Sequence, residues 1–281
     1  MREVGLHLRL NNSLVDLANE AELLNIDFFQ CFFVEQSSRK TIAPEKNDVD
    51  QFLRIRRERF DTLYAHASYC VNLASLNYNG HRALHREAEM ARRLEFTHII
   101  LHPGSANGAI ERTQGIDALA RALNTIVKLE RDIIFLLENT AHGSLSVGSN
   151  LLDFKALRSK LDQPDMVRYC IDTAHAYAYG YNIGDISEQE SFIRLLDETV
   201  GIENIDLFHL NDTKKACGSR IDRHEIVGNG AIVHAAVKHL VLHEKVAHLP
   251  ILMEAPYLAI HFLLMTACGS LIKMLKKNLH F

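Results

Sequence analysis

The sequence predicts an α/β protein that forms a (β/α)8 (TIM) barrel, with the active site at the C-terminal face of the strands. Eight short runs of apolar, β-branched or aromatic residues recur along the chain, and segments with helical periodicity lie between them. Regular alternation of strand and helix is typical of a parallel sheet that closes into a barrel. An open, doubly wound sheet is the alternative that this pattern allows.

The expected strands are short, and each is apolar enough to be buried on both faces, as the strands of a parallel sheet are. They comprise residues 4–8, 28–34, 68–73, 97–101, 133–137, 167–171, 205–210 and 251–253. No low-complexity linker or change of composition interrupts the series, so we expect one domain that spans residues 1–281.

The expected helices follow the strands. Asn12 or Ser13 can cap the first, whose apolar residues recur at the i, i+3, i+4 spacing of a buried stripe. Asp48 is expected to open the second helix, and Asn150 or Asp153 to open a later one. The remaining helices are expected at residues 81–96, 117–130, 188–200, 231–243 and 257–279.

The composition is that of an ordinary globular protein, with 47% hydrophobic and 23% charged residues among 281. A net charge of −4 provides no overall attraction to nucleic acid, so such binding would depend on a local basic patch or on bound cations. The five cysteines are scattered and form no CxxC pair, which favours a reducing, cytoplasmic location. No run of 18 apolar residues is present, and no membrane partner is expected.

Acidic residues and histidines fall at the ends of the expected strands. Those at strands three to eight are His66, His102, Glu138, Asp172, His209 and Glu254. His175 follows the sixth strand by a few residues, and Asp222 and His224 lie in the loop after the seventh. Because the strands of a barrel end at one face, we expect these nine side chains to meet in one site.

Nine oxygen and nitrogen donors exceed the needs of one ion, since a catalytic zinc usually takes three protein ligands and a water. Five imidazoles and four carboxylates without a cysteine suit Zn²⁺, whereas Mn²⁺ is a possible alternative and Mg²⁺ is poorly matched. The count predicts two or three ions with a bridging carboxylate. Such clusters favour hydrolysis of phosphate esters, because they hold the attacking hydroxide and the leaving oxygen together.

The segment FHLNDTKKACGSRIDRHEIVGNG, residues 208–230, combines potential metal ligands with potential phosphate-binding groups. Asp222 and His224 are two residues apart, so an extended backbone would point both side chains at the same ion. The loop between His209 and His224 is flexible and basic, as a phosphate-binding loop requires; its cations are Lys214, Lys215, Arg220 and Arg223.

Six segments carry a resemblance to a known family: HASYCVNLAS (66–75), LHPGS (101–105), LLENTA (136–141), CIDTAHAYAYGYNI (170–183), residues 208–230 and LMEAP (252–256). They closely resemble the endonuclease IV family of apurinic/apyrimidinic endonucleases, which are zinc-dependent barrel enzymes of DNA repair. The two long segments, 170–183 and 208–230, are the specific ones. All nine ligand positions carry the residue type that the resemblance leads one to expect.

The resemblance implies three zinc ions. His66 and His102 would hold the first, and Glu138 would bridge it to the second as the central catalytic carboxylate. Asp172, His209 and Glu254 would complete the second, and His175, Asp222 and His224 would hold the third. The implied enzyme is a monomer that acts on double-stranded DNA. It cuts 5′ to an abasic site, leaving a 3′-hydroxyl and a 5′-deoxyribose phosphate, and it trims blocked 3′ ends.

The resemblance also suggests DNA contacts. The loop after the second strand contributes Gln36, Arg39 and Lys40, and the third strand contributes Tyr69; the basic loop adds Lys214, Arg220 and Arg223. Departures from the family pattern concern the loop after the first strand, although His7 is present, and residues 142–149 and the tail after Pro256. Two other functions are weighed against this one: a divalent-metal sugar isomerase or epimerase, and a protein that binds abasic DNA without cutting it. The basic loop with its Asp-Arg-His segment argues against the isomerase.

Overall fold

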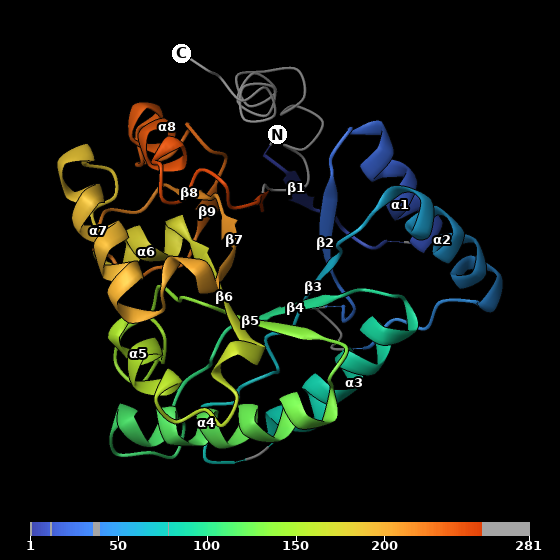
Figure 1. Cartoon of the computed structure of the whole chain (residues 1–281), viewed down its shortest axis with the longest axis horizontal. Helices are drawn as coiled ribbons and strands as arrows, with labels where there is room; N and C mark the ends of the chain where they lie inside the picture. The colour runs from blue at the N-terminus through green and yellow to red at the C-terminus, as the bar shows by residue number, and fades with distance from the viewer. Residues whose placement is uncertain (1, 12, 36–39, 78, 255–281) are drawn as a thin grey trace.

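The computed structural model describes residues 2–11, 13–35, 40–77 and 79–254. Within these ranges, eight parallel strands close a barrel in the order β1-β10-β7-β6-β5-β4-β3-β2, so that neighbours in space are neighbours in sequence around the ring. The predicted (β/α)8 barrel is therefore confirmed (Figure 1). Two short strands, β8 (Asp212–Thr213) and β9 (His224–Glu225), pair as a separate antiparallel ribbon in the loop after β7.

Seven of the eight predicted strands lie within a few residues of their expected positions. The barrel strands are β1 (Val4–His7), β2 (Phe28–Phe32), β3 (Tyr64–His66), β4 (His98–Leu101), β5 (Ile134–Glu138), β6 (Val167–Asp172), β7 (Ile205–His209) and β10 (Ile251–Met253).

The third strand was predicted wrongly at residues 68–73. The strand is Tyr64–His66, and residues 68–73 form a loop that begins with a turn in which Val71 N donates to Ser68 O. Val71 and Leu73 are buried although they belong to no strand. The apolar pattern at residues 68–73 therefore comes from a loop that packs onto the barrel. An apolar pattern indicates burial, but it does not distinguish a buried loop from a buried strand.

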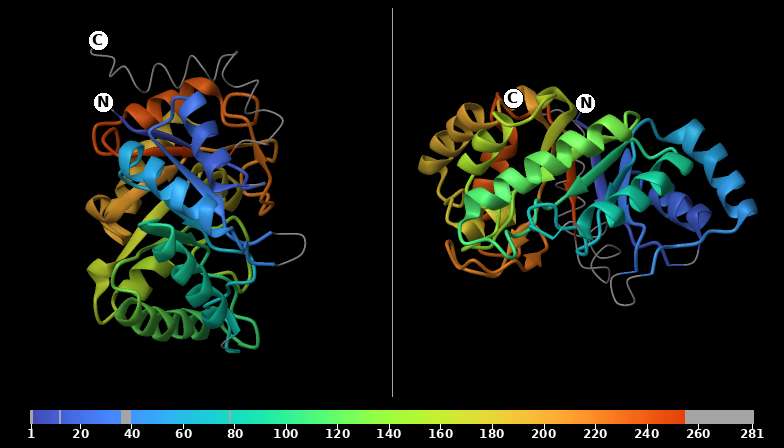
Figure 2. Two further views of the ribbon diagram at one scale, coloured as in Figure 1. Left: turned by 90° about the vertical axis from the view of Figure 1, so that its right-hand side faces the viewer. Right: turned by 90° about the horizontal axis from the view of Figure 1, so that it is seen from below.

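The helices lie around the outside of the strands (Figure 2). They are α1 (Leu14–Leu23), α2 (Lys46–Arg59), α3 (Asn79–Arg93), α4 (Arg112–Leu129), α5 (Leu152–Arg158), α6 (Thr173–Tyr179), α7 (Ile186–Thr199) and α8 (His234–Leu242), with 3-10 turns at Pro164–Met166 and Ile202–Asn204. Ser13 caps α1, as predicted, by accepting from Asp16 N. Asp48 does not open α2, which begins after Glu45; the Asp48 carboxylate instead accepts from Leu14 N at the start of α1.

Some expectations concern residues outside the described ranges, namely the helix at 257–279 and the proposed DNA contacts Gln36 and Arg39. Among the described residues, no helix is both long and apolar enough to cross a membrane. The four cysteines in the same part of the chain are free thiols, in agreement with the absence of a predicted disulfide framework.

The inside of the barrel is layered. One layer is an apolar cluster formed by Phe28, Tyr64, Ile100, Leu136, Cys170, Leu207 and Leu252. Side chains two residues apart on a strand point the same way, so the next layer up consists of the residues two positions further on. They are Gln30, His66, His102, Glu138, Asp172, His209 and Glu254, joined on β1 by His7, which is two residues beyond Gly5. The inside of the barrel therefore changes from an apolar layer to a polar layer over two residues of each strand.

At the opposite end of the barrel, His98 opens β4 with its ring beside that of Tyr64, at 4.9 Å between centroids. Burial lowers the pKa of His98 to about 4. An unfolded histidine titrates near 6.5, so the folded state resists protonation and loses stability as the pH falls through 6.5 towards 4. We expect the unfolding free energy to fall by about 2 kcal/mol between pH 8 and pH 5 through this group. Chemical denaturation at both pH values should show a smaller difference in His98→Gln; an unchanged difference would contradict the assignment.

Candidate metal centre

The nine predicted donors converge at the carboxyl face of the barrel. Six follow or end a strand, His175 lies in the first turn of α6, and Asp222 and His224 come from the loop after β7. The potential ligand atoms of eight of them form three groups, within each of which they lie within 4.8 Å of one another, and Asp222 lies beside the third group. These groups are His66, His102 and Glu138; then Glu138, Asp172, His209 and Glu254; then Asp172, His175 and His224.

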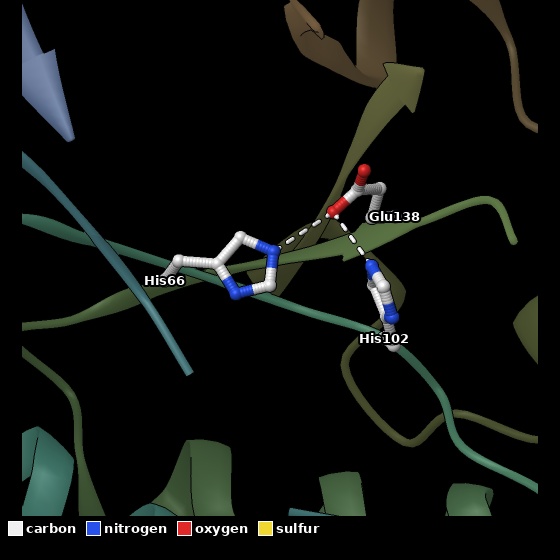
Figure 3. A group of neighbouring side chains, drawn as sticks. All are labelled: His66, His102 and Glu138. Atoms are coloured by element: carbon white, nitrogen blue, oxygen red, sulfur yellow. Dashed lines mark hydrogen bonds and ion pairs between the residues drawn. The ribbon is translucent and has the colours of Figure 1, made fainter. Parts of the chain in front are cut away.

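The first group gathers around one oxygen of Glu138. His66 Nε2 lies 3.1 Å and His102 Nε2 3.2 Å from Glu138 Oε2 (Figure 3). The other nitrogen of His66, Nδ1, lies 2.8 Å from the carbonyl of Ala67, to which it donates, so Nε2 is left with its lone pair towards the group. Bonds of about 2.0–2.1 Å in a tetrahedral zinc site separate its ligand atoms by roughly 3.3 Å, which these contacts match.

The second group uses the other oxygen of the same carboxylate. His209 Nδ1 lies 3.1 Å from Glu138 Oε1, 3.6 Å from Glu254 Oε2 and 4.0 Å from Asp172 Oδ2. Glu138 is fully buried and belongs to both groups, one oxygen in each. This is the geometry that a carboxylate bridging two cations requires.

The third group brings the Nε2 atoms of two imidazoles together, with the ring planes tilted by 46°. His175 Nε2 and His224 Nε2 are 3.3 Å apart, and the two oxygens of Asp222 lie 3.2 Å and 3.3 Å from them. Asp172 Oδ2 is 3.7 Å from His224 Nε2. Asp172 thus lies between the second and third groups, whereas the sequence assigned it to the second alone. Its other oxygen caps α6 by accepting from His175 N at 2.6 Å, which fixes the ring of His175 relative to the strand end.

The electrostatics of the site favour cations. Burial alone would raise the pKa of Glu138, but the imidazoles of His209, His102 and His175 outweigh it and hold that pKa well below its usual value. Burial would lower the pKa of His175, but the carboxylates around that ring raise it well above its usual value. Glu138 is therefore ionised, and a proton on His175 helps to balance its charge. A divalent cation supplies the same compensation by displacing protons, so the donor set fits a bound metal.

A pocket of about 330 Å³ opens above the donors. Apart from the donors, its walls include His7, Phe32, Tyr69 and Arg223. Tyr69 is 68% exposed at the rim, and its pKa is raised to about 12 by partial burial and by nearby carboxylates, so the phenol is neutral at physiological pH. The pocket combines a polar floor with aromatic walls.

The predicted DNA contacts fall into two sets. Tyr69 and Arg223 line the pocket. Lys214 forms an ion pair with Glu225 at 2.6 Å, and Arg220 lies over the ring of Tyr179 at 3.6 Å from its centroid, so both also serve to hold the loop. Lys40 is exposed after β2.

Sequence reasoning missed several residues that position the donors. Asn211 Nδ2 donates to Asp172 Oδ2 at 2.6 Å and to Glu254 Oε2 at 3.1 Å, and Asn139 Oδ1 accepts from Asp172 N at 2.7 Å. Gln30 is the residue that strand β2 contributes to the polar layer, and its amide contacts His209 and Glu254. Its signal was available, because it lies two residues beyond the apolar Phe28, as His66 lies two beyond Tyr64.

Asp212 was missed as well. Its buried carboxylate accepts four backbone N–H groups, those of Thr213, Gly228, Gly230 and Ile232. These contacts gather both ends of the loop that carries Asp222 and His224. No local pattern reveals them, since the N–H groups lie up to 20 residues along the chain.

The fold and the donor-lined pocket define the class: a (β/α)8 barrel with a potential metal site at the strand ends. A family model described as xylose isomerase-like TIM barrel matches residues 18–266. The probable endonuclease 4 of Thermoplasma acidophilum is 33% identical over 260 residues, 90% of this chain and 89% of the relative. Endonuclease IV from Thermus thermophilus has a solved structure with a TM-score of 0.82 and 25% identity, covering 96% of this chain and 99% of that one.

The chain belongs to the endonuclease IV family. The predicted family and the predicted enzyme class, an endonuclease among the hydrolases, are confirmed. A solved D-psicose 3-epimerase in the presence of D-fructose shares the barrel with a TM-score of 0.62 at 12% identity, covering 90% of this chain and 85% of that chain. At that identity the likeness concerns the fold alone, so it does not favour sugar chemistry.

Proposed function

We propose that this protein is a zinc-dependent DNA-repair endonuclease that hydrolyses the phosphodiester 5′ to an abasic site. The products are a 3′-hydroxyl and a 5′-deoxyribose phosphate, and the same site trims blocked 3′ ends. The observation that carries the proposal is the division of the Glu138 carboxylate, whose two oxygens each belong to a different donor group. Membership of the endonuclease IV family supports the choice of substrate.

Three zinc ions fit the three groups. His66, His102 and Glu138 would hold the first, Glu138, Asp172, His209 and Glu254 the second, and His175, His224 and Asp222 the third, with Asp172 beside it. Bound zinc would supply a hydroxide at neutral pH, by lowering the pKa of water to about 7, and would neutralise charge on the phosphate. The imidazole content favours zinc over magnesium, and manganese can replace it in part.

The protein contributes the placement of the substrate. The donors lie at the floor of a pocket, so the abasic nucleotide has to leave the helix to reach them. That step costs little where no base pair is lost. Tyr69 at the rim and Arg223 in the wall would contact the displaced sugar and its phosphates. We assign the flanking DNA backbone to Lys40, Lys214 and Arg220, together with Gln36 and Arg39, and we expect the protein to act as a monomer in the cytoplasm.

The decisive experiment pairs a cleavage assay with elemental analysis of the purified protein. A duplex oligonucleotide with one abasic analogue should be cut once, 5′ to the lesion, by protein that contains about three zinc ions. A gel shift without cleavage would instead support a non-cleaving binder. Turnover of a ketose or aldose without cleavage would support the sugar isomerase.

Arg220→Ala is expected to weaken DNA binding. If Arg220 contacts one phosphate, its loss should reduce the slope of log affinity against log salt by roughly 1. Fluorescence anisotropy at several salt concentrations measures that slope. Arg194→Ala, on the outer helix α7, is the matched control and should bind as the wild type does. An unchanged slope in Arg220→Ala would leave Arg220 as a residue that only packs on Tyr179.

A further inference from the structure

Gln30 is the single amide in a layer that otherwise consists of imidazoles and carboxylates among the described strand ends. It lies on β2, has no exposed surface, and pairs in register with His7 on β1. A fully buried amide is stable only when its donors and acceptor are paired. Gln30 therefore has to be explained by the groups that surround it.

Three polar groups surround the amide, and they determine its orientation. The carboxylate oxygen Glu254 Oε1 lies 2.6 Å from Gln30 Nε2, and an ionised carboxylate only accepts, so the nitrogen of Gln30 must face it. Its second hydrogen points at His7 Nδ1, 2.7 Å away. The carbonyl Oε1 then faces His209 Nε2 at 3.0 Å and accepts the hydrogen of that nitrogen. Every donor and acceptor of the amide is used.

This arrangement decides which atom of each neighbour remains for a cation. His209 keeps its hydrogen on Nε2, so Nδ1 is directed at Glu138 and Asp172. Glu254 receives Gln30 on Oε1 and Asn211 on Oε2, so Oε2, the oxygen nearest His209 Nδ1, faces the second group. Cys170 also contacts the His209 ring, but a thiol is a much weaker hydrogen-bond partner than an amide carbonyl.

We propose that Gln30 is a positioning residue for the second metal position, fixing the tautomer of His209 and the direction of the Glu254 carboxylate at the same time. The inference rests on the proposed function, because it presupposes that a cation binds the second group. Gln30 acts through His209 and Glu254 and is not itself one of the donors. Metal ligands are usually each oriented by a separate hydrogen-bond partner, whereas the amide of Gln30 orients both His209 and Glu254.

The same amide gives His7 a defined role. Because His7 Nδ1 accepts from Gln30, the hydrogen of its ring is on Nε2, and His7 lines the pocket. His7 thus presents its Nε2–H as a donor beside the second group, and the contact with Gln30 maintains this tautomer. Loss of Gln30 frees His7 to take the other tautomer.

The test compares two buried glutamines. In Gln30→Leu, and in Gln30→Met as a second variant of similar length, the amide is removed. Gln189→Leu is the matched control: Gln189 is also fully buried and also makes three contacts, to Ile183 O, Ala236 O and His239 Nδ1, but it lies on α7 outside the metal centre. Zinc is withdrawn from each loaded protein by increasing concentrations of a chelator of known affinity, and melting temperatures are recorded in parallel.

We expect one zinc ion to be bound about 10- to 100-fold more weakly in both Gln30 variants, while the others are held as in the wild type. Gln189→Leu should lower the melting temperature and leave all zinc affinities unchanged. Zinc affinities in the Gln30 variants equal to those of the wild type would overturn the inference, and so would an equal loss in Gln189→Leu. Wild-type protein that binds no zinc would instead overturn the proposed function on which the inference rests.

Discussion

Glu138→Gln is expected to abolish strand cleavage and to lower the zinc content. The amide that replaces the carboxylate has only one oxygen, so it can bind an ion beside the His66–His102 pair or beside His209, but not both. Its NH2 group faces the other position and cannot bind a cation there. We expect cleavage to fall by roughly three orders of magnitude or more, which corresponds to about 4 kcal/mol in the activation barrier. Single-turnover cleavage of the abasic duplex and elemental analysis measure the two effects.

A matched control separates the loss of a bridging carboxylate from the loss of any buried one. Glu130 is also buried and also has an imidazole partner, His85 at 2.6 Å, together with Arg92 at 3.1 Å, but it lies at the end of α4. Glu130→Gln should reduce stability and leave zinc content and cleavage in place. Near-normal cleavage by Glu138→Gln would remove that residue from the centre of the mechanism.

Asp212→Asn is expected to disorder the loop that carries two donors of the third group. Each oxygen of Asp212 accepts two backbone N–H groups. The NH2 group of an asparagine would replace one of these oxygens, and because it cannot accept a hydrogen bond, two N–H groups would lose their partner. Leaving two buried N–H groups unpaired costs roughly 2 to 4 kcal/mol. The expected result is loss of one zinc ion, faster proteolysis within residues 214–223 and strongly reduced cleavage.

Limited proteolysis and zinc analysis test this result against Asp48→Asn. Asp48 accepts backbone N–H groups on both oxygens too, from Leu14 and Val15, but it supports the start of α1. Asp48→Asn should keep its zinc content, and its loop at residues 214–223 should resist proteolysis as in the wild type. A wild-type zinc content in Asp212→Asn would show that Asp222 and His224 are placed without the buried carboxylate.

The convergence of these side chains could be predicted because their position in the chain reflects their position in the fold. Glu138 and Asp172 end apolar runs, and parallel strands of a closed barrel must bring such ends together. How these side chains divide among the three groups was harder to predict from the sequence. Asp172 lies beside both the second and the third group because the first turn of α6 returns His175 to its carboxylate, a three-dimensional relation that spacing along a strand does not encode.

Other errors came from treating residue type as a sign of role. Only acidic residues and histidines were predicted as donors, so the amide Gln30 was missed, although it lies two residues beyond Phe28 on a predicted strand. Residues 68–73 were read as a strand because loop residues such as Val71 are as buried as strand residues. Arg220 was read only as a phosphate contact. It also stacks on Tyr179, because Arg220 N donates to Ala178 O and so seats the loop on the end of α6.

The partners that orient the donors belong to the barrel itself. The carbonyl of Ala67 receives His66 Nδ1–H, the carbonyl of Asn139 receives His175 Nδ1–H, and Asn211 supports both Asp172 and Glu254. Small zinc domains fold only around their ion, whereas here hydrogen bonds within the barrel orient the donors. Under the proposed function, withdrawal of zinc should therefore stop cleavage while the barrel persists, and renewed supply should restore activity without refolding of the chain.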